Sequence, residues 1–224
     1  NIVGEVHADG EIIAGAWWDY AINLGGNLST AIDTMADLFA ASHYGLATGP
    51  DGAEGEVYHD ILIDALTYDD NDNNINNGTP HFMPIVQAFA KHGIYLLSNT
   101  ELHHTAPEFT TAGNAVTLNA LAIPDYPAFL GDVKMFYRLR GTTTTDSVLM
   151  TKSGTNYTGN FPATTSVGEI YEYYFTVYDN ASIASAQAPI ASKFNLGSTV
   201  RNLPYFLMVG YYSAYLQNFD TITT

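Results

Sequence analysis

The chain has 224 residues, 46% of them hydrophobic, so it can fill one large core or two ordinary ones. Seven Lys and Arg stand against 23 Asp and Glu, and the net charge of −16 argues against nucleic acid as a partner. No run approaches the roughly 18 apolar residues of a membrane span, and the absence of cysteine excludes disulfides, thiolate zinc sites and cysteine nucleophiles.

Apolar residues recur at helical spacing in the first part of the chain, from Asp9 to about Ile94. Asp9 is the predicted N-cap of the first helix, and the pair Gly25 and Gly26 is its predicted stop. The first three predicted helices span roughly 10–23, from Ser29 or Thr30 to about Ser42, and from about Gly55 to Thr67.

The fourth predicted helix has the clearest local signals. Thr79 is its predicted N-cap, Pro80 stands at the first helical position, and Gly93 is the predicted C′ residue. Its apolar positions repeat at i, i+3, i+4 and i+7, which predicts one buried face. These positions are Phe82, Ile85, Val86 and Phe89.

After Asn114 the apolar residues alternate as they do in half-buried strands. The predicted strands are 115–122, 132–140, 147–151, 157–161, 169–179 and 189–196. Several short strands within about 90 residues predict an antiparallel sandwich of the immunoglobulin or fibronectin type. The chain is therefore predicted to be an α + β multi-domain protein, with a helical part at 1–100, a linker at 101–113, the sandwich at 114–200, and a tail or the start of a further module at 201–224.

Common catalytic motifs are absent from the sequence. It contains no Gly-x-Ser-x-Gly, no phosphate-binding glycine loop and no His-Glu-x-x-His. Residues 56–59 supply only one histidine, His59, so they do not present two imidazoles on one helix face. The chain is thus expected to lack a zinc site of its own and to hydrolyse nothing when isolated.

Two segments carry a resemblance to a known family. Residues 6–19 (VHADGEIIAGAWWD) resemble the segment of thermolysin-like and fungalysin-like zinc metallopeptidases in which a catalytic histidine precedes a helix of the C-terminal subdomain. Residues 77–82 (NGTPHF) and 85–94 (IVQAFAKHGI) are similar to the last helix of that subdomain. The order and spacing of both segments agree with the family, and the resemblance covers about residues 1–94.

The resemblance implies a role for His7. Its imidazole would donate a hydrogen bond to the oxyanion that forms when zinc-bound water attacks a peptide carbonyl, a contribution of roughly 2.7–4 kcal/mol. The family places an orienting acid a few residues earlier, and here the only carboxylate in that stretch is Glu5. For a lone histidine the ordinary alternative is a surface side chain, and the surrounding string favours the catalytic interpretation.

The implied protein is a secreted, extracellular endopeptidase that acts on a peptide or protein substrate. Its zinc ligands would lie in a missing N-terminal half, and this chain would be a fragment that starts at Asn1. The alternative is a non-catalytic extracellular binding or spacer module. Trp17 and Trp18 are predicted to belong to the core rather than to a substrate subsite. The other histidines, His43, His59, His81, His92, His103 and His104, show no metal-site spacing, and the last two are expected to be a solvated linker pair.

An acidic and amide-rich loop spans residues 69–78. Asp70, Asp72, Asn74 and Asn76 alternate as oxygen ligands of calcium do, although the loop lacks the glycine and the glutamate of an EF-hand. An Asx-rich turn that leads into the next helix explains the same residues equally well. Both interpretations stay open.

Overall fold

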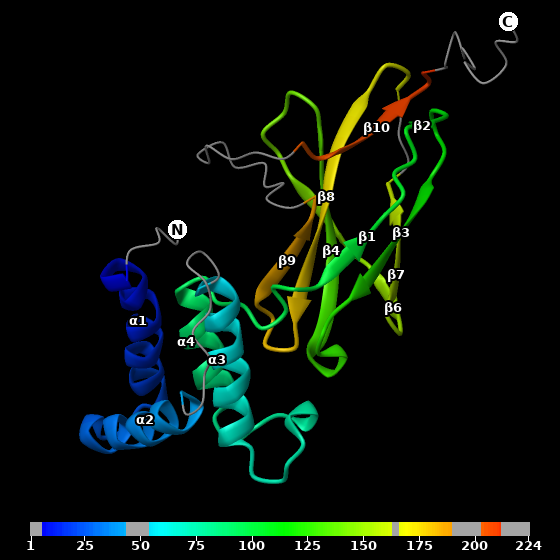
Figure 1. Ribbon diagram of the computed structural model, residues 1–224. Coiled ribbons are helices and arrows are strands. Elements are labelled where there is room, and N and C mark those ends of the chain that lie inside the picture. Colours follow the sequence, from blue (N-terminus) through cyan, green and yellow to red (C-terminus); the bar gives the residue numbers. More distant parts are fainter. Residues whose placement is uncertain (1–5, 44–53, 163–165, 190–202, 212–224) are drawn as a thin grey trace, which may run out of the picture. The chain divides into compact units, whose positions relative to one another are not determined.

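The computed structural model describes residues 6–43, 54–162, 166–189 and 203–211, which form two compact units (Figure 1). The first unit contains the helices, and the second contains most of the strands. Described residues of the first unit fall within 1–101, 122–132 and 177–186, and those of the second within 102–121, 133–176 and 187–224. The mixed helix and strand content confirms the α + β class.

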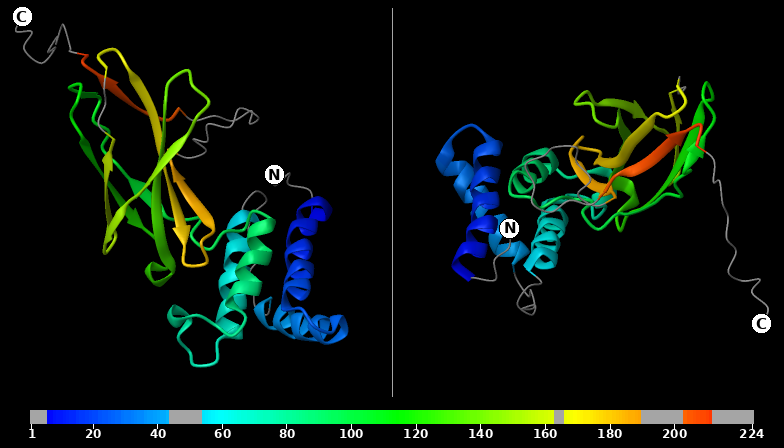
Figure 2. Two further views of the ribbon diagram at one scale, coloured as in Figure 1. Left: turned by 180° about the vertical axis from the view of Figure 1, so that it is seen from behind. Right: turned by 90° about the horizontal axis from the view of Figure 1, so that it is seen from above.

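The helical unit has four α-helices, of which α1 packs against α2 and α4, and α3 packs against the same two helices (Figure 2). Its core is made of fully buried apolar and aromatic side chains, including Tyr20, Leu62, Leu66, Ile85 and Phe89. The helices are α1 (Val6–Leu24), α2 (Leu28–Ser42), α3 (Glu54–Asp69) and α4 (Phe82–Lys91), with short 3-10 turns η1 (Ile75–Asn77) and η2 (Pro127–Phe129).

Helix α1 begins earlier than its local signals predict. Asp9 lies inside the first turn and is only 3% exposed, so it is not the N-cap. The Tyr58 hydroxyl of α3 donates to the Asp9 carbonyl oxygen at 2.6 Å. Contact with α3 thus takes Asp9 out of solvent, and tertiary packing overrides the capping signal. The predicted stop is confirmed, because Gly25 follows the helix with φ +70°.

Helix α2 is capped by Asn27, whose side chain accepts from the backbone N–H groups of Ser29 and Thr30. The helix therefore begins at Leu28, and neither Ser29 nor Thr30 is the cap. The third helix ends at Asp69, two residues later than predicted.

Helix α4 begins at Phe82, so Thr79 and Pro80 lie before it and are not its N-cap and first residue. The Asp69 carboxylate, at the end of α3, accepts from Thr79 Oγ1 and from the His81 backbone N–H, each at 2.6 Å. This carboxylate therefore fixes the start of α4 from a distance of 12 positions along the chain.

The far end of α4 follows the prediction. Gly93 has φ +81°, its N–H donates to the Ala90 carbonyl oxygen, and the Ile94 N–H reaches the Phe89 carbonyl oxygen, each at 3.1 Å. This pair of bonds is the Schellman motif, which favours glycine at the left-handed position. Of the predicted apolar face, Ile85, Val86 and Phe89 are buried.

The strands form two sheets within the described residues. The four-stranded sheet has the order β1-β3-β7-β6, and the six-stranded sheet has the order β2-β10-β8-β4-β5, with β9 also paired to β8. The pairs β3/β7, β6/β7, β4/β5 and β8/β10 are antiparallel, whereas β2/β10 is parallel. The strands are β1 (Glu101–His103), β2 (Phe109–Thr110), β3 (Val116–Ile123), β4 (Leu130–Leu139), β5 (Asp146–Leu149), β6 (Thr151–Ser153), β7 (Asn156–Phe161), β8 (Ile170–Asp179), β9 (Ala184–Ala188) and β10 (Tyr205–Val209).

Alternation along the strands builds the core of the second unit. Val133 and Met135 of β4 are fully buried, as the alternation predicts. In β8 the residues 172–177 are all buried, so this strand does not alternate, and its Tyr173 and Phe175 are fully buried. The aromatic side chains Tyr173 and Phe175 meet edge to face at 5.8 Å between ring centroids.

Two segments outside the predicted sandwich turn out to be strands. The segment 101–113, predicted as a linker, contains β1 and β2. The run Tyr205–Val209, predicted as a tail or the start of a further module, is β10, which lies inside the six-stranded sheet between β2 and β8. The predicted strand 189–196 falls almost entirely outside the described residues, and β9 precedes it.

Candidate functional site

His7 lies in the first turn of α1, and its side chain is exposed. The prediction placed it just before a helix, and the earlier start of α1 puts it inside one. Its exposure is what a donor to a substrate needs, and it is also what an ordinary surface histidine shows. Glu5, the only carboxylate in the expected orienting stretch, lies outside the described residues.

The two segments that carry the family resemblance pack directly against each other as α1 and α4. Trp17 of α1 meets Phe89 of α4 edge to face, with ring centroids 5.3 Å apart. Asn23 Nδ2 donates to the Pro84 carbonyl oxygen at 3.1 Å near the other end of α1. Trp17 is 2% exposed and belongs to the core as predicted, whereas Trp18 is 52% exposed and does not.

A charged cluster that the sequence analysis missed also joins α1 to α4. Asp19 Oδ2 lies 3.0 Å from His92 Nε2, and Asp19 Oδ1 lies 3.4 Å from Lys91 Nζ. The hydrogen bond from His92 lowers the pKa of the Asp19 carboxyl, and Lys91 lowers it further. Asp19 and His92 are 73 positions apart in the sequence, so no local motif predicts their contact.

Several other histidines have structural partners. His81 Nδ1 lies 2.6 Å from Asp69 Oδ1, His59 Nε2 lies 3.1 Å from the Leu96 carbonyl oxygen, and His43 Nδ1 lies 2.8 Å from the Phe39 carbonyl oxygen. Across the described ranges, no three His, Cys, Asp or Glu side chains form a group that could hold a metal ion. The described part of this chain therefore offers no ligand set for zinc.

The carboxylates of the acidic loop point at the loop's own donors. Asp72 Oδ1 accepts from the Asn74 backbone N–H at 3.0 Å, and Asp72 Oδ2 accepts from Asn77 Nδ2 at 2.7 Å. Asp70 Oδ2 also accepts from the Asn74 N–H. The bond between Asp72 and the Asn74 N–H, two residues later, is that of an Asx turn, one of the two predicted interpretations. Calcium binding by Asp70, Asp72, Asn74 and Asn76 stays a prediction.

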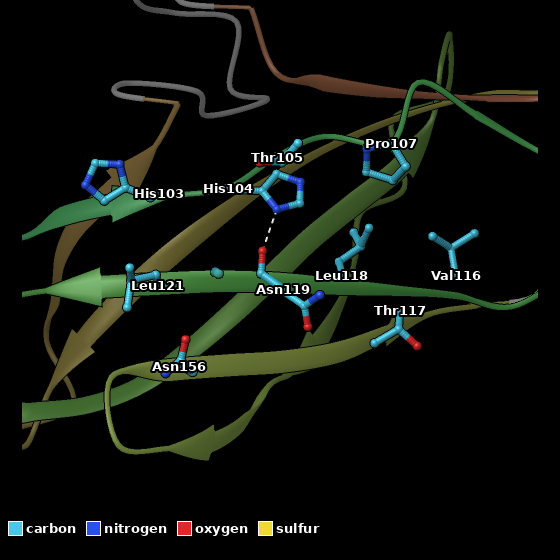
Figure 3. Close-up of a pocket in the computed structure, with 11 residues that line it drawn as sticks. His103, His104, Thr105, Pro107, Val116, Thr117, Leu118, Asn119, Leu121 and Asn156 are labelled. Atoms are coloured by element: carbon cyan, nitrogen blue, oxygen red, sulfur yellow. Dashed lines mark hydrogen bonds between the residues drawn. The ribbon is translucent and has the colours of Figure 1, made fainter.

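A pocket of about 580 Å³ lies in the second unit, where the chain leaves β1 and passes along β3 (Figure 3). One wall is the stretch from His103 to Pro107, and the other is β3 from Val116 to Leu121. Asn156 of β7 closes the rim. No Lys, Arg, Asp or Glu is among these lining residues.

His104 is one of the residues that line this pocket. Its Nδ1 lies 2.6 Å from the Asn119 carbonyl oxygen (Figure 3). Its Nε2 lies 2.9 Å from the Tyr173 hydroxyl. Because a carbonyl only accepts, Nδ1 carries the proton, and Nε2 accepts from Tyr173 in the neutral ring. The ring also meets Phe175 and Tyr205, at centroid distances of 4.8 and 4.9 Å.

The environment of His104 corrects the prediction of a solvated linker pair. Burial lowers the pKa of the His104 imidazole, although the bond to Asn119 opposes that shift. His103 beside it is exposed as predicted. His104 directly follows the end of β1, and successive residues of an extended chain point to opposite sides.

No family model matches the chain, and no curated protein matches it significantly. None of the described helices combines the length and the apolar character needed to cross a membrane.

Proposed function

We propose that this chain is part of a secreted zinc-dependent endopeptidase and that α1–α4 form one wall of its active-site cleft. The observation that carries the proposal is the direct packing of α1 on α4, which brings together the two segments that resemble metallopeptidases. If both segments derive from one metallopeptidase subdomain, they are expected to pack against each other in the folded chain. The zinc ligands belong, in this proposal, to an N-terminal half outside the chain.

His7 is the residue that this chain contributes to the chemistry. His7 is exposed in the first turn of α1, and in this proposal its imidazole faces a substrate held by the other half of the enzyme. Donation to the oxyanion of the tetrahedral intermediate stabilises the transition state more than the ground state. The substrate class is a peptide or protein, since the stabilised oxyanion is that of an attacked amide carbonyl.

The test uses the full-length parent enzyme. His7→Ala is expected to lower kcat by about 100–1000-fold with unchanged zinc content, because the lost bond forms in the transition state. Glu11→Ala, one turn later on α1 and also exposed, is the matched control and is expected to retain activity. Wild-type activity in His7→Ala would refute the catalytic role, and zinc loss in that variant would place His7 among the metal ligands.

The second candidate function is a non-catalytic extracellular binding or spacer module. The observation that favours it is the open pocket beside β3, which is independent of the helical unit. A His-Glu-x-x-His motif upstream in the parent gene separates the two functions: its presence supports the peptidase, and its absence supports the binding module.

A further inference from the structure

The edge of β3 that faces the pocket is only partly paired. Strand β3 has eight residues, whereas its neighbour β1 has three and ends at His103. Just beyond that point, His104 Nδ1 bonds to the Asn119 carbonyl oxygen on this edge at 2.6 Å. The rest of the edge, toward Val116, runs along the pocket (Figure 3).

The direction of the Asn119 carbonyl fixes the direction of its neighbours. In an antiparallel strand, the N–H and C=O of one residue point to the same side, and the side alternates from residue to residue. The backbone N–H and C=O groups of Asn119 point away from β7, and so do those of Thr117. The backbone groups of Leu118 and Ala120 point toward β7. The backbone N–H and C=O of Thr117 and the N–H of Asn119 therefore face the pocket.

The opposite wall does not pair with these groups. Thr105 and Pro107 stand across the pocket, and Pro107 has no N–H to donate. In the part of the chain that the structure describes, no backbone hydrogen bond joins the segment 105–107 to Thr117 or Asn119. Unpaired edge groups of this kind are a template for another strand.

We propose that this pocket binds an extended peptide segment of a partner polypeptide, which adds as a short strand to the β3 edge. Its backbone would pair with the N–H and C=O of Thr117 and the N–H of Asn119. Same-side groups two residues apart on an extended chain repeat at about 6.6–6.8 Å, so a peptide matches their spacing. The uncharged lining favours a neutral backbone over an ionic ligand.

The side chains that line the pocket suggest which side chains of a bound peptide would be recognised. Leu121 and Pro107 give apolar contact, and Asn156 gives an amide on the rim. Alternate side chains of the bound strand would therefore meet one polar and one apolar surface. This inference concerns the second unit and does not depend on the proposed peptidase activity.

Amide chemical shifts of the isotope-labelled chain test the proposal. The probe is a blocked hexapeptide of alternating Thr and Val, and the control is the same peptide N-methylated on alternate amides. The Thr117 and Asn119 amides are expected to shift and to become protected from hydrogen exchange on adding millimolar peptide, with at least a tenfold loss of affinity for the N-methylated peptide. Equal binding of both peptides, or no shift at these two amides, would overturn the proposal.

Two variants localise the effect. Thr117→Pro removes the edge N–H without touching the β3/β7 ladder, and it is expected to abolish the protection, whereas Thr117→Val keeps it. If Thr117→Pro does not fold, Asn156→Trp takes its place in the test. Asn156 is exposed on the rim, and the larger side chain is expected to block the pocket. Unchanged peptide binding in a folded Asn156→Trp variant contradicts the proposal. The proposal also fails if the molecular mass doubles and the same amides shift without peptide, because a second copy of the chain would then be the occupant.

Discussion

Gly15 of α1 lies directly against the imidazole ring of His92, with no room between them for a side chain. A Cβ built at Gly15 would overlap the His92 ring, standing only 2.9 Å from Nδ1, whereas one built at Gly10 in the same helix meets nothing within 4 Å. The ring is also held by Asp19 at 3.0 Å. His92 therefore cannot move aside without losing that bond.

Gly15→Ala is expected to lower the free energy of unfolding by about 1–3 kcal/mol, because the added methyl group overpacks the α1/α4 contact. Gly10→Ala is the matched control, and it is expected to be neutral or to stabilise by up to about 1 kcal/mol through helix propensity. Urea unfolding measures both. Equal effects of the two substitutions would contradict the close contact at His92.

Asp69→Asn is expected to destabilise the chain by about 2–3 kcal/mol, in the range of hydrogen bonds to charged groups. The carboxylate accepts from Thr79 Oγ1 and the His81 N–H, and an amide would turn a donor toward one of them. Asp37→Asn on the exposed side of α2 is the control and is expected to change little. Thermal unfolding of both variants checks this, and an unaffected Asp69→Asn variant would remove the proposed anchor of α4.

His104 makes stability depend on pH. Burial lowers its pKa below the ordinary value of 6.5, so the unfolded chain takes up the proton first as pH falls. The contribution of His104 is therefore complete above about pH 6.5 and declines below it, until the pKa of the folded state is reached. Urea unfolding at pH 8 and pH 5 is expected to show a smaller loss in His104→Gln than in the wild type. An identical loss in both proteins would assign the pH dependence to other groups.

Calcium titration separates the two interpretations of the acidic loop. If Asp70, Asp72, Asn74 and Asn76 ligate the ion, millimolar Ca²⁺ is expected to raise the melting temperature of the wild type and not that of the Asp70→Asn, Asp72→Asn double variant. Calorimetry supplies the binding heat. Absence of both signals would leave the carboxylates with a structural role, as acceptors from Asn74 and Asn77 within the loop.

Features set by neighbouring residues were predictable from the sequence. Gly93 is the C′ residue of α4 because the left-handed conformation at a helix end favours glycine, and that requirement is local. Likewise, the buried face of α4 and the alternation of Val133 and Met135 in β4 follow from the helical and strand repeats.

Features set by distant partners were not predictable. The Asp69 carboxylate, at the end of α3, holds the residues just before α4, and Thr79, the predicted N-cap, donates to it instead of capping the helix. His104 resembles a solvated linker residue until the fold brings Tyr173 to its ring, 69 positions away. His7, the predicted catalytic residue, is exposed in the first turn of α1, where the sequence predicted a position just before the helix.

The place of β10 in the six-stranded sheet affects the order in which that sheet is completed during translation. Within the described sheet, β2 has no neighbour other than β10, which is the last of these strands to be synthesised. The growing chain thus presents β2 and part of the β8 edge unpaired until residues 205–209 emerge from the ribosome. Exposed strand edges are prone to association with other chains. A pause in synthesis before this segment would therefore prolong the interval in which these two edges are exposed to other chains.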